Sequence, residues 1–283
     1  MSKLILERNK LELTESQLKM IKSGWGTEAV DSAVVRKITY KSDGLKVKGY
    51  VAYPKDDSKK YPCIIWNRGG IGNAGAIDSF NAQGIFGQLA SWGYVVFASQ
   101  YRGNDGGEGV DEFGGSDIND VLNLIPLAEE VEVADNSKWG IEGWSRGGMM
   151  TYLALTKTNM FKAAIVTGGI ANLRCNANES PFMKKLYQAT MGQYGSEDFQ
   201  SKCDMRSVIN FADKLSKDTP LLLMHGTHDK RVLPHDTLDF ASKLIELGTK
   251  FRLVMFEEGD HFLKSHRKEV DELREMWFDK HLK

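Results

Sequence analysis

The stretch Gly143-Trp144-Ser145-Arg146-Gly147 decides how this chain is interpreted, because of the residues on either side of it. Residues 138–142 (KWGIE) predict a short strand before it, and residues 148–155 (GMMTYLAL) predict the start of a buried helix after it. A strand that runs into G-x-S-x-G and then into a helix holds the serine on a sharp turn with its hydroxyl exposed. Glycines leave room for such a turn, in which the serine backbone is strained. We therefore predict that Ser145 is a nucleophile; the alternative is an ordinary glycine-rich turn.

Two further residues complete a catalytic triad, in the order serine, acid, histidine that goes with this turn in the α/β-hydrolase fold. Asp229 follows a buried strand at 220–226 (PLLLMHG), and His261 follows another at 251–256 (FRLVMF). Active sites of open α/β sheets lie at the carboxyl ends of strands. Asp229 is thus predicted to orient His261, which takes the proton of Ser145. The alternatives are that Asp229 is a solvated turn residue and His261 an ordinary loop histidine. The loops of Ser145, Asp229 and His261 are all predicted at the same edge of the sheet, which favours the triad.

The other histidines and acids fit structural positions better. His225 precedes a glycine at a strand end and is expected to pack under the turn, while His228 stands too close to Asp229 in sequence to be oriented by it. Asp236 is the rival acid, but it falls inside a predicted helical turn. His235 is assigned to a helix start, and His266 and His281 to the last helix. The side chain of Asp260 is expected to face away from the site. We predict no metal and no cofactor, because His225-x-x-His228 resembles metal-ligand spacing only faintly and no Cys pair or HExxH helix accompanies it.

Composition narrows the classes of protein that the chain can represent. It has 283 residues and a net charge of −1, which suits one large α/β domain and argues against nucleic acid or an anionic membrane as partner. Its apolar runs are strand-sized, and residues 1–10 lack the features of a signal peptide. Three cysteines, Cys63, Cys175 and Cys203, are an odd and sparse set, so we expect a reducing, cytoplasmic setting without a Cys175–Cys203 bridge. Homo-oligomerisation is left open.

The order of predicted elements defines the architecture. Residues 1–32 are interpreted as an N-terminal arm whose helix opens at a capping box, Thr14 to Gln17, and runs through Lys22 to Gly24. Residues 33–283 are interpreted as one α/β-hydrolase domain that starts with a hairpin, residues 34–40 and 45–53. Strands and helices then alternate, which predicts a mostly parallel, doubly wound sheet. The predicted strands are 63–67, 94–99, 138–142, 163–167, 220–226 and 251–256, and the helices are 78–92, 116–130, 148–155 and 265–282.

The alternation breaks between about residues 169 and 215. We interpret this stretch as a small helical cap inserted before the next strand. Its aromatic and methionine side chains either roof a substrate pocket or pack the insert onto the sheet. They include Met183, Tyr187, Met191, Tyr194, Phe199 and Met205.

A serine hydrolase also needs backbone donors for the oxyanion of its tetrahedral intermediate. The helix after Ser145 points its N-terminal N–H groups toward the place where this charge forms. One donor is therefore predicted to be the N–H of Arg146. The other is expected from the loop Arg68-Gly69-Gly70-Ile71-Gly72 after the strand 63–67, where glycines allow close approach of a substrate; an ordinary glycine turn is the alternative.

Over residues 35–283 the ordered motifs resemble the catalytic domain of the prolyl-oligopeptidase family of serine hydrolases. The stretches that carry the resemblance are Tyr61-Pro62-Cys63-Ile64-Ile65 with Arg68-Gly69-Gly70, Gln100-Tyr101-Arg102-Gly103, Gly143-Trp144-Ser145-Arg146-Gly147-Gly148, His225-Gly226 with Asp229 and Val232, and Gly259-Asp260-His261. The resemblance implies the same triad, Ser145, Asp229 and His261, and assigns the second oxyanion donor to Gly70. Arg68, Trp144 and Tyr101 are the candidate substrate-binding residues.

The chain also departs from the family. Arg68 stands where the family often has His or Tyr, and Arg146 where its peptidases often have Tyr, so either arginine binds a substrate carboxylate or pairs with a neighbour. The β-propeller of the family's peptidases does not fit in 283 residues. We therefore expect a serine hydrolase that acts through an acyl-enzyme on small esters, amides or short peptides. The alternatives are a peptidase of the aminopeptidase or acylaminoacyl type and, more remotely, a non-catalytic binding protein with the hydrolase fold.

Overall fold

The computed structural model describes residues 3–283, which form two compact units. The first unit contains the described residues up to Asp111 together with Ser116–Gly140. The second contains Glu112–Gly115 and Ile141–Lys283. Strand β6 (Ala134–Trp144) passes from the first unit into the second.

In the first unit, a sheet forms in the order β1-β2-β3-β5-β4-β6. It begins with three antiparallel strands, β1 (Ile5–Lys10), β2 (Ala33–Ser42) and β3 (Leu45–Pro54). Asp43 and Gly44 both have positive φ, as a two-residue hairpin turn requires, so the predicted hairpin is present. β5 (Val95–Ser99) is antiparallel to β3 and parallel to β4 (Tyr61–Asn67). The predicted helix at 78–92 is α3 (Ser79–Ser91), capped by the Asp78 side chain.

From residue 3 on, the segment predicted as an N-terminal helical arm belongs to the first unit. The capping box of Thr14 and Gln17 is present, but α1 (Glu15–Trp25) continues through Gly24 and ends at Gly26, whose φ is 92°. Trp25 lies against α3: a Cβ added to Gly84 would stand 2.5 Å from its ring. The short helix α2 (Glu28–Asp31) is fixed to α3 by the Gln83 Nε2 that donates to the Ala29 carbonyl over 2.7 Å. The strand β1 ahead of α1 was not predicted.

The helix predicted at 116–130 is wrong as a single element. The structure has a five-residue helix α4 (Ile118–Leu122) and then a 3₁₀ helix (Ile125–Glu130). Pro126 lies in the first turn of the 3₁₀ helix. Since proline lacks an N–H and clashes with the preceding turn, it does not continue an α-helix.

In the second unit, the strand order is β6-β7-β8-β9. β8 (Leu221–Gly226) is parallel to both β7 (Phe161–Thr167) and β9 (Phe251–Phe256). α9 (Pro234–Glu246) packs on β8, and α10 (Arg267–Leu282) packs on β7. All six residues of β8 are buried, as expected for a parallel strand covered on both faces.

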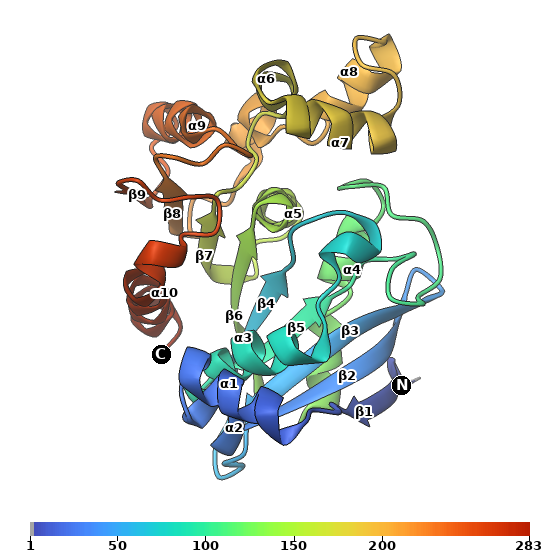
Figure 1. Ribbon diagram of the computed structural model, residues 1–283, viewed down its shortest axis with the longest axis vertical. Helices are drawn as coiled ribbons and strands as arrows, with labels where there is room; N and C mark the ends of the chain where they lie inside the picture. Colours follow the sequence, from blue (N-terminus) through green and yellow to red (C-terminus); the bar gives the residue numbers. More distant parts are fainter. Residues whose placement is uncertain (1–2) are drawn as a thin grey trace. The chain divides into compact units, whose positions relative to one another are not determined.

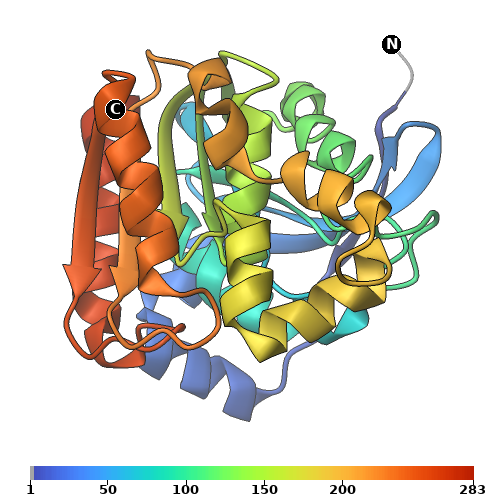
Figure 2. The same cartoon turned by 90° about the horizontal axis from the view of Figure 1, so that it is seen from above.

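The stretch between β7 and β8, which was predicted as a cap insert at about 169–215, is helical. It contains α6 (Leu173–Glu179), α7 (Pro181–Met191), α8 (Glu197–Asp204) and a 3₁₀ helix (Val208–Lys214). Figures 1 and 2 both show α6, α7 and α8, in yellow to light orange, grouped together. Met183, Tyr187, Met191 and Phe199 are buried within the second unit, so they pack the insert, whereas Met205 is exposed.

Across residues 3–283, the structure contains no helix that is both long enough and apolar enough to traverse a bilayer. Cys63, Cys175 and Cys203 are all free thiols.

Candidate active site

Ser145 lies on a strained turn between β6 and α5 (Arg146–Leu155). Its φ of 58° and ψ of −123° are unfavourable for a residue with a side chain and store roughly 1–3 kcal/mol. The turn brings backbone segments too close for side chains. A Cβ added to Gly143 would stand 2.0 Å from the Gly147 carbonyl oxygen, and one at Gly148 would stand 2.6 Å from Gly169 Cα. The glycines of the motif are therefore required by the turn that exposes Ser145.

Asp229 and His261 lie on the loops after β8 and β9 and face each other. The distance from His261 Nδ1 to Asp229 Oδ2 is 2.7 Å, and the two residues are only 7% and 3% exposed. The other carboxylate oxygen accepts hydrogen bonds from the backbone N–H groups of Arg231 (2.8 Å) and Val232 (3.1 Å). This arrangement fixes the carboxylate toward one nitrogen of the imidazole.

Asp229 is held in its ionised form. Burial by itself would raise the pKa of its carboxyl, but this is outweighed by hydrogen bonds from His225 and His261, by the charge of His261 and by the Arg231 N–H. The net effect lowers the pKa of Asp229 well below its usual range. A permanently ionised carboxylate stabilises the charged form of the histidine it contacts.

His225 is a partner of Asp229 that the sequence analysis missed. It is buried, as expected, and its Nε2 lies 2.9 Å from the Val232 carbonyl and 3.2 Å from Asp229 Oδ2. Because Nε2 faces two acceptors, it carries the proton, and Nδ1 accepts from the Thr237 hydroxyl over 2.7 Å. The position of His225 in the sequence could have indicated this contact with Asp229, because His225-Gly226 ends the strand that leads to Asp229.

Backbone contacts bring Ser145 to the Asp229–His261 pair. The Ser145 N–H donates to the Thr167 carbonyl over 2.9 Å, and the next residue, Gly168, lies beside the pair. A Cβ added to Gly168 would stand 3.4 Å from Asp229 Oδ2 and 3.6 Å from His261 Nδ1. In addition, the Trp144 indole N–H donates to the His261 carbonyl over 2.9 Å. The backbone on either side of Ser145 is therefore tied to the segments that carry the Asp229–His261 pair, within the second unit.

The rival residues have other partners. Asp236 is buried and accepts from the Ala171 N–H and from Asn176 Nδ2, and burial raises its pKa to about 7. Asp260 accepts from the backbone N–H groups of Phe262 and Lys264 within its own loop. His228 is exposed.

Two predicted substrate contacts are corrected by the structure of the first unit. Arg68 is buried, and its guanidinium donates to the carbonyls of Gln100, Gly69 and Gly72 at 2.8–3.3 Å. Arg68 was expected either to bind a substrate carboxylate or to pair with a neighbour. These hydrogen bonds correspond to the second role. Tyr101 is fully buried, lies under the Arg68 guanidinium at 4.9 Å and donates from its hydroxyl to the Arg68 carbonyl over 3.0 Å. Both side chains shape the loop after β4 and are not presented to a ligand.

The predicted oxyanion donors lie on different units. Arg146 is the first residue of α5, where backbone N–H groups lack acceptors within the helix. Its side chain is buried, with the guanidinium 4.7 Å from the centre of the Phe113 ring, so Arg146 packs within the second unit. In the first unit, Gly70 has a φ of 71°, and a Cβ added there would stand 2.7 Å from Gly75 Cα. The oxyanion roles of the two N–H groups remain predictions.

A buried ion pair supports the strand that carries Ser145. Glu142, three residues before the serine, accepts two hydrogen bonds from the Arg274 guanidinium of α10, at 2.6 and 2.8 Å. Arg274 also donates to Asp271 over 2.8 Å. Both members of the Glu142–Arg274 pair are buried, so neither charge is stabilised by bulk water. The sequence analysis did not pair them, because 132 residues separate them.

Replacing Arg274 by methionine is expected to lower the free energy of unfolding by about 3–5 kcal/mol, because Glu142 would remain buried as an unpaired charge. Urea denaturation at pH 7 measures the loss. The double variant Glu142→Gln/Arg274→Met should recover most of it. A single variant as stable as the native protein would show that the pair contributes nothing to the fold.

The comparisons with known proteins agree with this fold. The family model of the prolyl oligopeptidase family matches residues 80–283. The uncharacterized peptidase YtmA of Bacillus subtilis is 29% identical over 83% of this chain and 90% of its own length. Acylamino-acid-releasing enzyme 1 of Oryza sativa subsp. japonica is 27% identical over 69% of this chain, but this covers only 27% of the rice protein. The structure of the acylaminoacyl peptidase of Pyrococcus horikoshii superposes with a TM-score of 0.78 and 26% identity, covering 96% of this chain and 44% of the other.

The sheet, the strained turn at Ser145 and the structural match define an α/β-hydrolase, which confirms the predicted fold class. The chain belongs to the prolyl oligopeptidase family, and it is a serine hydrolase. It corresponds to nearly the whole of the Bacillus protein and to a part of the longer rice and archaeal enzymes.

Proposed function

We propose that Ser145, Asp229 and His261 are the catalytic triad of a serine peptidase that cleaves short peptides or acylated amino acids. The 2.7 Å contact between His261 Nδ1 and Asp229 Oδ2 carries the proposal. The ionised Asp229 carboxylate can only accept a hydrogen bond, so His261 Nδ1 is the donor and bears the proton. His261 Nε2 therefore keeps its lone pair. His261 is thereby in the tautomer that a general base needs.

In the proposed reaction, His261 Nε2 takes the proton of the Ser145 hydroxyl as the oxygen attacks a carbonyl carbon. The N–H group of Arg146, the first residue of α5, holds the resulting oxyanion. His261 then gives its proton to the leaving amine, and the carbon–nitrogen bond breaks to leave an acyl-enzyme. Water attacks the acyl group by the same proton route, which releases the acid and restores Ser145.

Peptides are favoured as substrates by the names of the relatives, which are peptidases and acylamino-acid-releasing enzymes. Small esters are the second candidate, because acyl-enzyme chemistry on an ester is easier than on an amide. A panel of aryl esters, aminoacyl amides and N-acylaminoacyl amides separates the two. A higher kcat/KM on aminoacyl amides than on N-acylaminoacyl amides, or the reverse, supports a peptidase. Turnover confined to the aryl esters contradicts it.

The surface beside His261 offers an element of specificity. The Arg231 guanidinium lies 4.7 Å from the ring centre of Phe262 and 5.4 Å from that of Phe182. Both rings are unusually exposed for phenylalanine, at 45% and 52%. Arg231 is two residues after the proposed acid, Asp229, and Phe262 directly follows the proposed base. We infer that this cluster contacts the substrate, with the rings against an apolar side chain and the guanidinium against a carboxylate.

Replacing Arg231 by glutamine should raise KM about tenfold for a peptide with a free carboxylate, with little change for its amidated form. A charge-assisted hydrogen bond contributes about 1.5–3 kcal/mol, and tenfold in affinity corresponds to about 1.4 kcal/mol. Steady-state kinetics on the matched peptides measure this ratio. Lys230→Gln, which removes a neighbouring exposed charge, is the control. An equal ratio of KM values in Arg231→Gln and the native enzyme would contradict the inference.

A further inference from the structure

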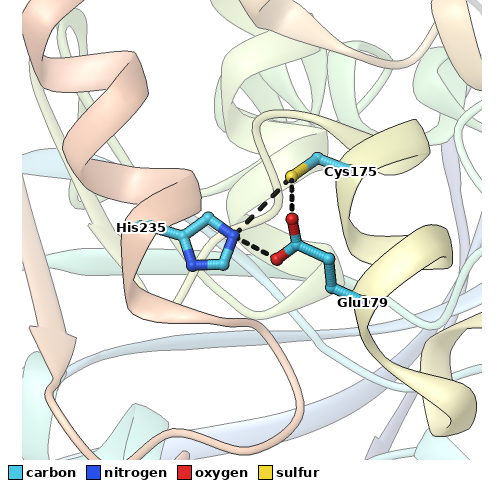
Figure 3. Close-up of side chains that lie close together, drawn as sticks. All are labelled: Cys175, Glu179 and His235. Atoms are coloured by element: carbon cyan, nitrogen blue, oxygen red, sulfur yellow. Dashed lines mark hydrogen bonds and ion pairs between the residues drawn. The ribbon is translucent and has the colours of Figure 1, made fainter.

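Three side chains with metal-binding chemistry meet away from the proposed triad. Cys175 and Glu179 lie one turn apart on α6, and His235 lies in the first turn of α9 (Figure 3). His235 Nε2 stands 3.6 Å from Cys175 Sγ and 2.5 Å from Glu179 Oε2, and Cys175 Sγ stands 3.4 Å from Glu179 Oε1. Residues 60 positions apart in the chain thus form one compact cluster.

The spacing of these atoms fits a tetrahedral metal ion. One sulfur, one nitrogen and one oxygen lie within 4.8 Å of one another. Zinc binds such atoms at about 2.0–2.3 Å, which sets ligand–ligand separations on the order of 3.3–3.8 Å in a tetrahedron. Two of the three contacts are already in this range, and only the Glu179–His235 contact has to widen. Small side-chain rotations therefore suffice.

The geometry differs from that of a second nucleophilic site. In a nucleophile–histidine–acid relay the imidazole uses one nitrogen for each partner. At His235, a single nitrogen, Nε2, faces both the thiol and the carboxylate (Figure 3). Three donors that converge on one point are the arrangement of a ligand set.

The cluster is held in place by its surroundings. Asp236, next to His235, accepts hydrogen bonds from Asn176 Nδ2 (2.6 Å) and from the Ala171 N–H (3.0 Å). Asn176 in turn follows Cys175 directly. These buried contacts fix the start of α9 against α6, so the ligands are arranged before an ion arrives.

Although the sequence pattern predicted no metal, we propose that Cys175, Glu179 and His235 form a binding site for a thiophilic divalent metal ion, with zinc as the best match. A thiolate, an imidazole and a carboxylate together favour zinc over magnesium or calcium, which prefer oxygen ligands. Binding displaces the thiol proton to solvent, and the Glu179 carboxylate together with the nearby Asp239 adds negative charge for a cation. The three ligands leave a fourth position for water or a small ligand. Cys175 and Glu179 line an open surface depression together with Arg174 and Asn178, which gives such a ligand access.

The site links the insert to the loop of the proposed acid. His235 is two residues before Thr237, whose hydroxyl contacts His225, the partner of Asp229. A metal ion between α6 and α9 would therefore fasten the inserted helices to the element that supports Asp229. We expect bound zinc to raise the melting temperature, because an ion that binds only the folded state stabilises it.

Cobalt titration of the metal-free full-length chain tests this site. One equivalent of Co²⁺ should produce the intense visible bands of a tetrahedral ion and a near-ultraviolet thiolate-to-cobalt charge-transfer band, and Zn²⁺ should abolish both. Cys175→Ser should lose the charge-transfer band, and His235→Gln and Glu179→Gln should each weaken Zn²⁺ binding more than about tenfold.

Matched variants separate this site from adventitious binding and from the proposed triad. Cys203→Ser removes another thiol of the insert and should bind Co²⁺ as the native chain does. Ser145→Ala should also bind normally, so failure of the triad proposal would leave this result unchanged. Absence of a thiolate band in the folded native chain would overturn the proposal. Equal metal affinity in the native, Cys175→Ser and His235→Gln chains would overturn it as well.

Discussion

Replacing Ser145 by alanine is expected to lower kcat by about 10⁶-fold, the largest effect of any single substitution in this chain. The reason is that the account routes every turnover through a covalent bond to the Ser145 oxygen. Alanine removes this oxygen without adding bulk at a turn where the backbone is already strained at φ 58°. Burst and steady-state kinetics on an aryl ester measure the loss.

Two controls make this result specific to the nucleophile. Thermal unfolding should show that Ser145→Ala is at least as stable as the native enzyme, because its turn keeps the same glycines. Ser207→Ala removes another buried hydroxyl of the second unit, which accepts a hydrogen bond from the Leu173 N–H. This variant should retain turnover. Residual activity within tenfold of the native value in Ser145→Ala would show that another group attacks the substrate.

Asp229→Asn is expected to lower kcat by about 10⁴-fold, the effect of the equivalent change in another serine–histidine–aspartate triad. The amide presents a donor or a neutral oxygen to His261 Nδ1, which favours the wrong imidazole tautomer and removes the charge that stabilises the imidazolium. Because Asp229 Oδ1 accepts from two backbone N–H groups, an asparagine can keep its own carbonyl on them and turn its NH₂ toward His261. Steady-state kinetics near neutral pH measure the effect.

The rival acid supplies the matched control. Asp236→Asn changes another buried carboxyl of the same unit, whose partners are Ala171 and Asn176 and not His261. It should leave kcat within a few-fold of the native value. If Asp236→Asn were the slower of the two variants, Asp229 would be the wrong acid.

Local patterns in the sequence were sufficient to predict the fold and the candidate triad. The Ser145 turn depends on glycines only four residues apart, and the acid and base follow strands whose apolar character is evident. The helix predicted at 78–92 is found at 79–91, within one residue at each end. Such features depend on neighbours in the chain, so one sequence reveals them.

The remaining features depend on contacts between distant residues. Glu142 meets Arg274, and Cys175 meets His235, only after the strands and helices have packed. Their residue types are common on surfaces, so no local pattern sets them apart. The same limit explains Arg68 and Tyr101, which were named as candidate substrate-binding residues, with pairing to a neighbour as the alternative for Arg68. Their burial depends on how the loop after β4 folds back on itself.

The most direct test of the central claim is labelling with a fluorophosphonate, followed by intact-mass measurement and peptide mapping. The account predicts one adduct per chain on Ser145, formed by the native protein and absent from Ser145→Ala. It also predicts much slower labelling of Asp229→Asn, since the histidine no longer activates the serine. A folded native chain that forms no adduct, or an adduct that maps to another residue, would contradict the assignment of Ser145 as the nucleophile.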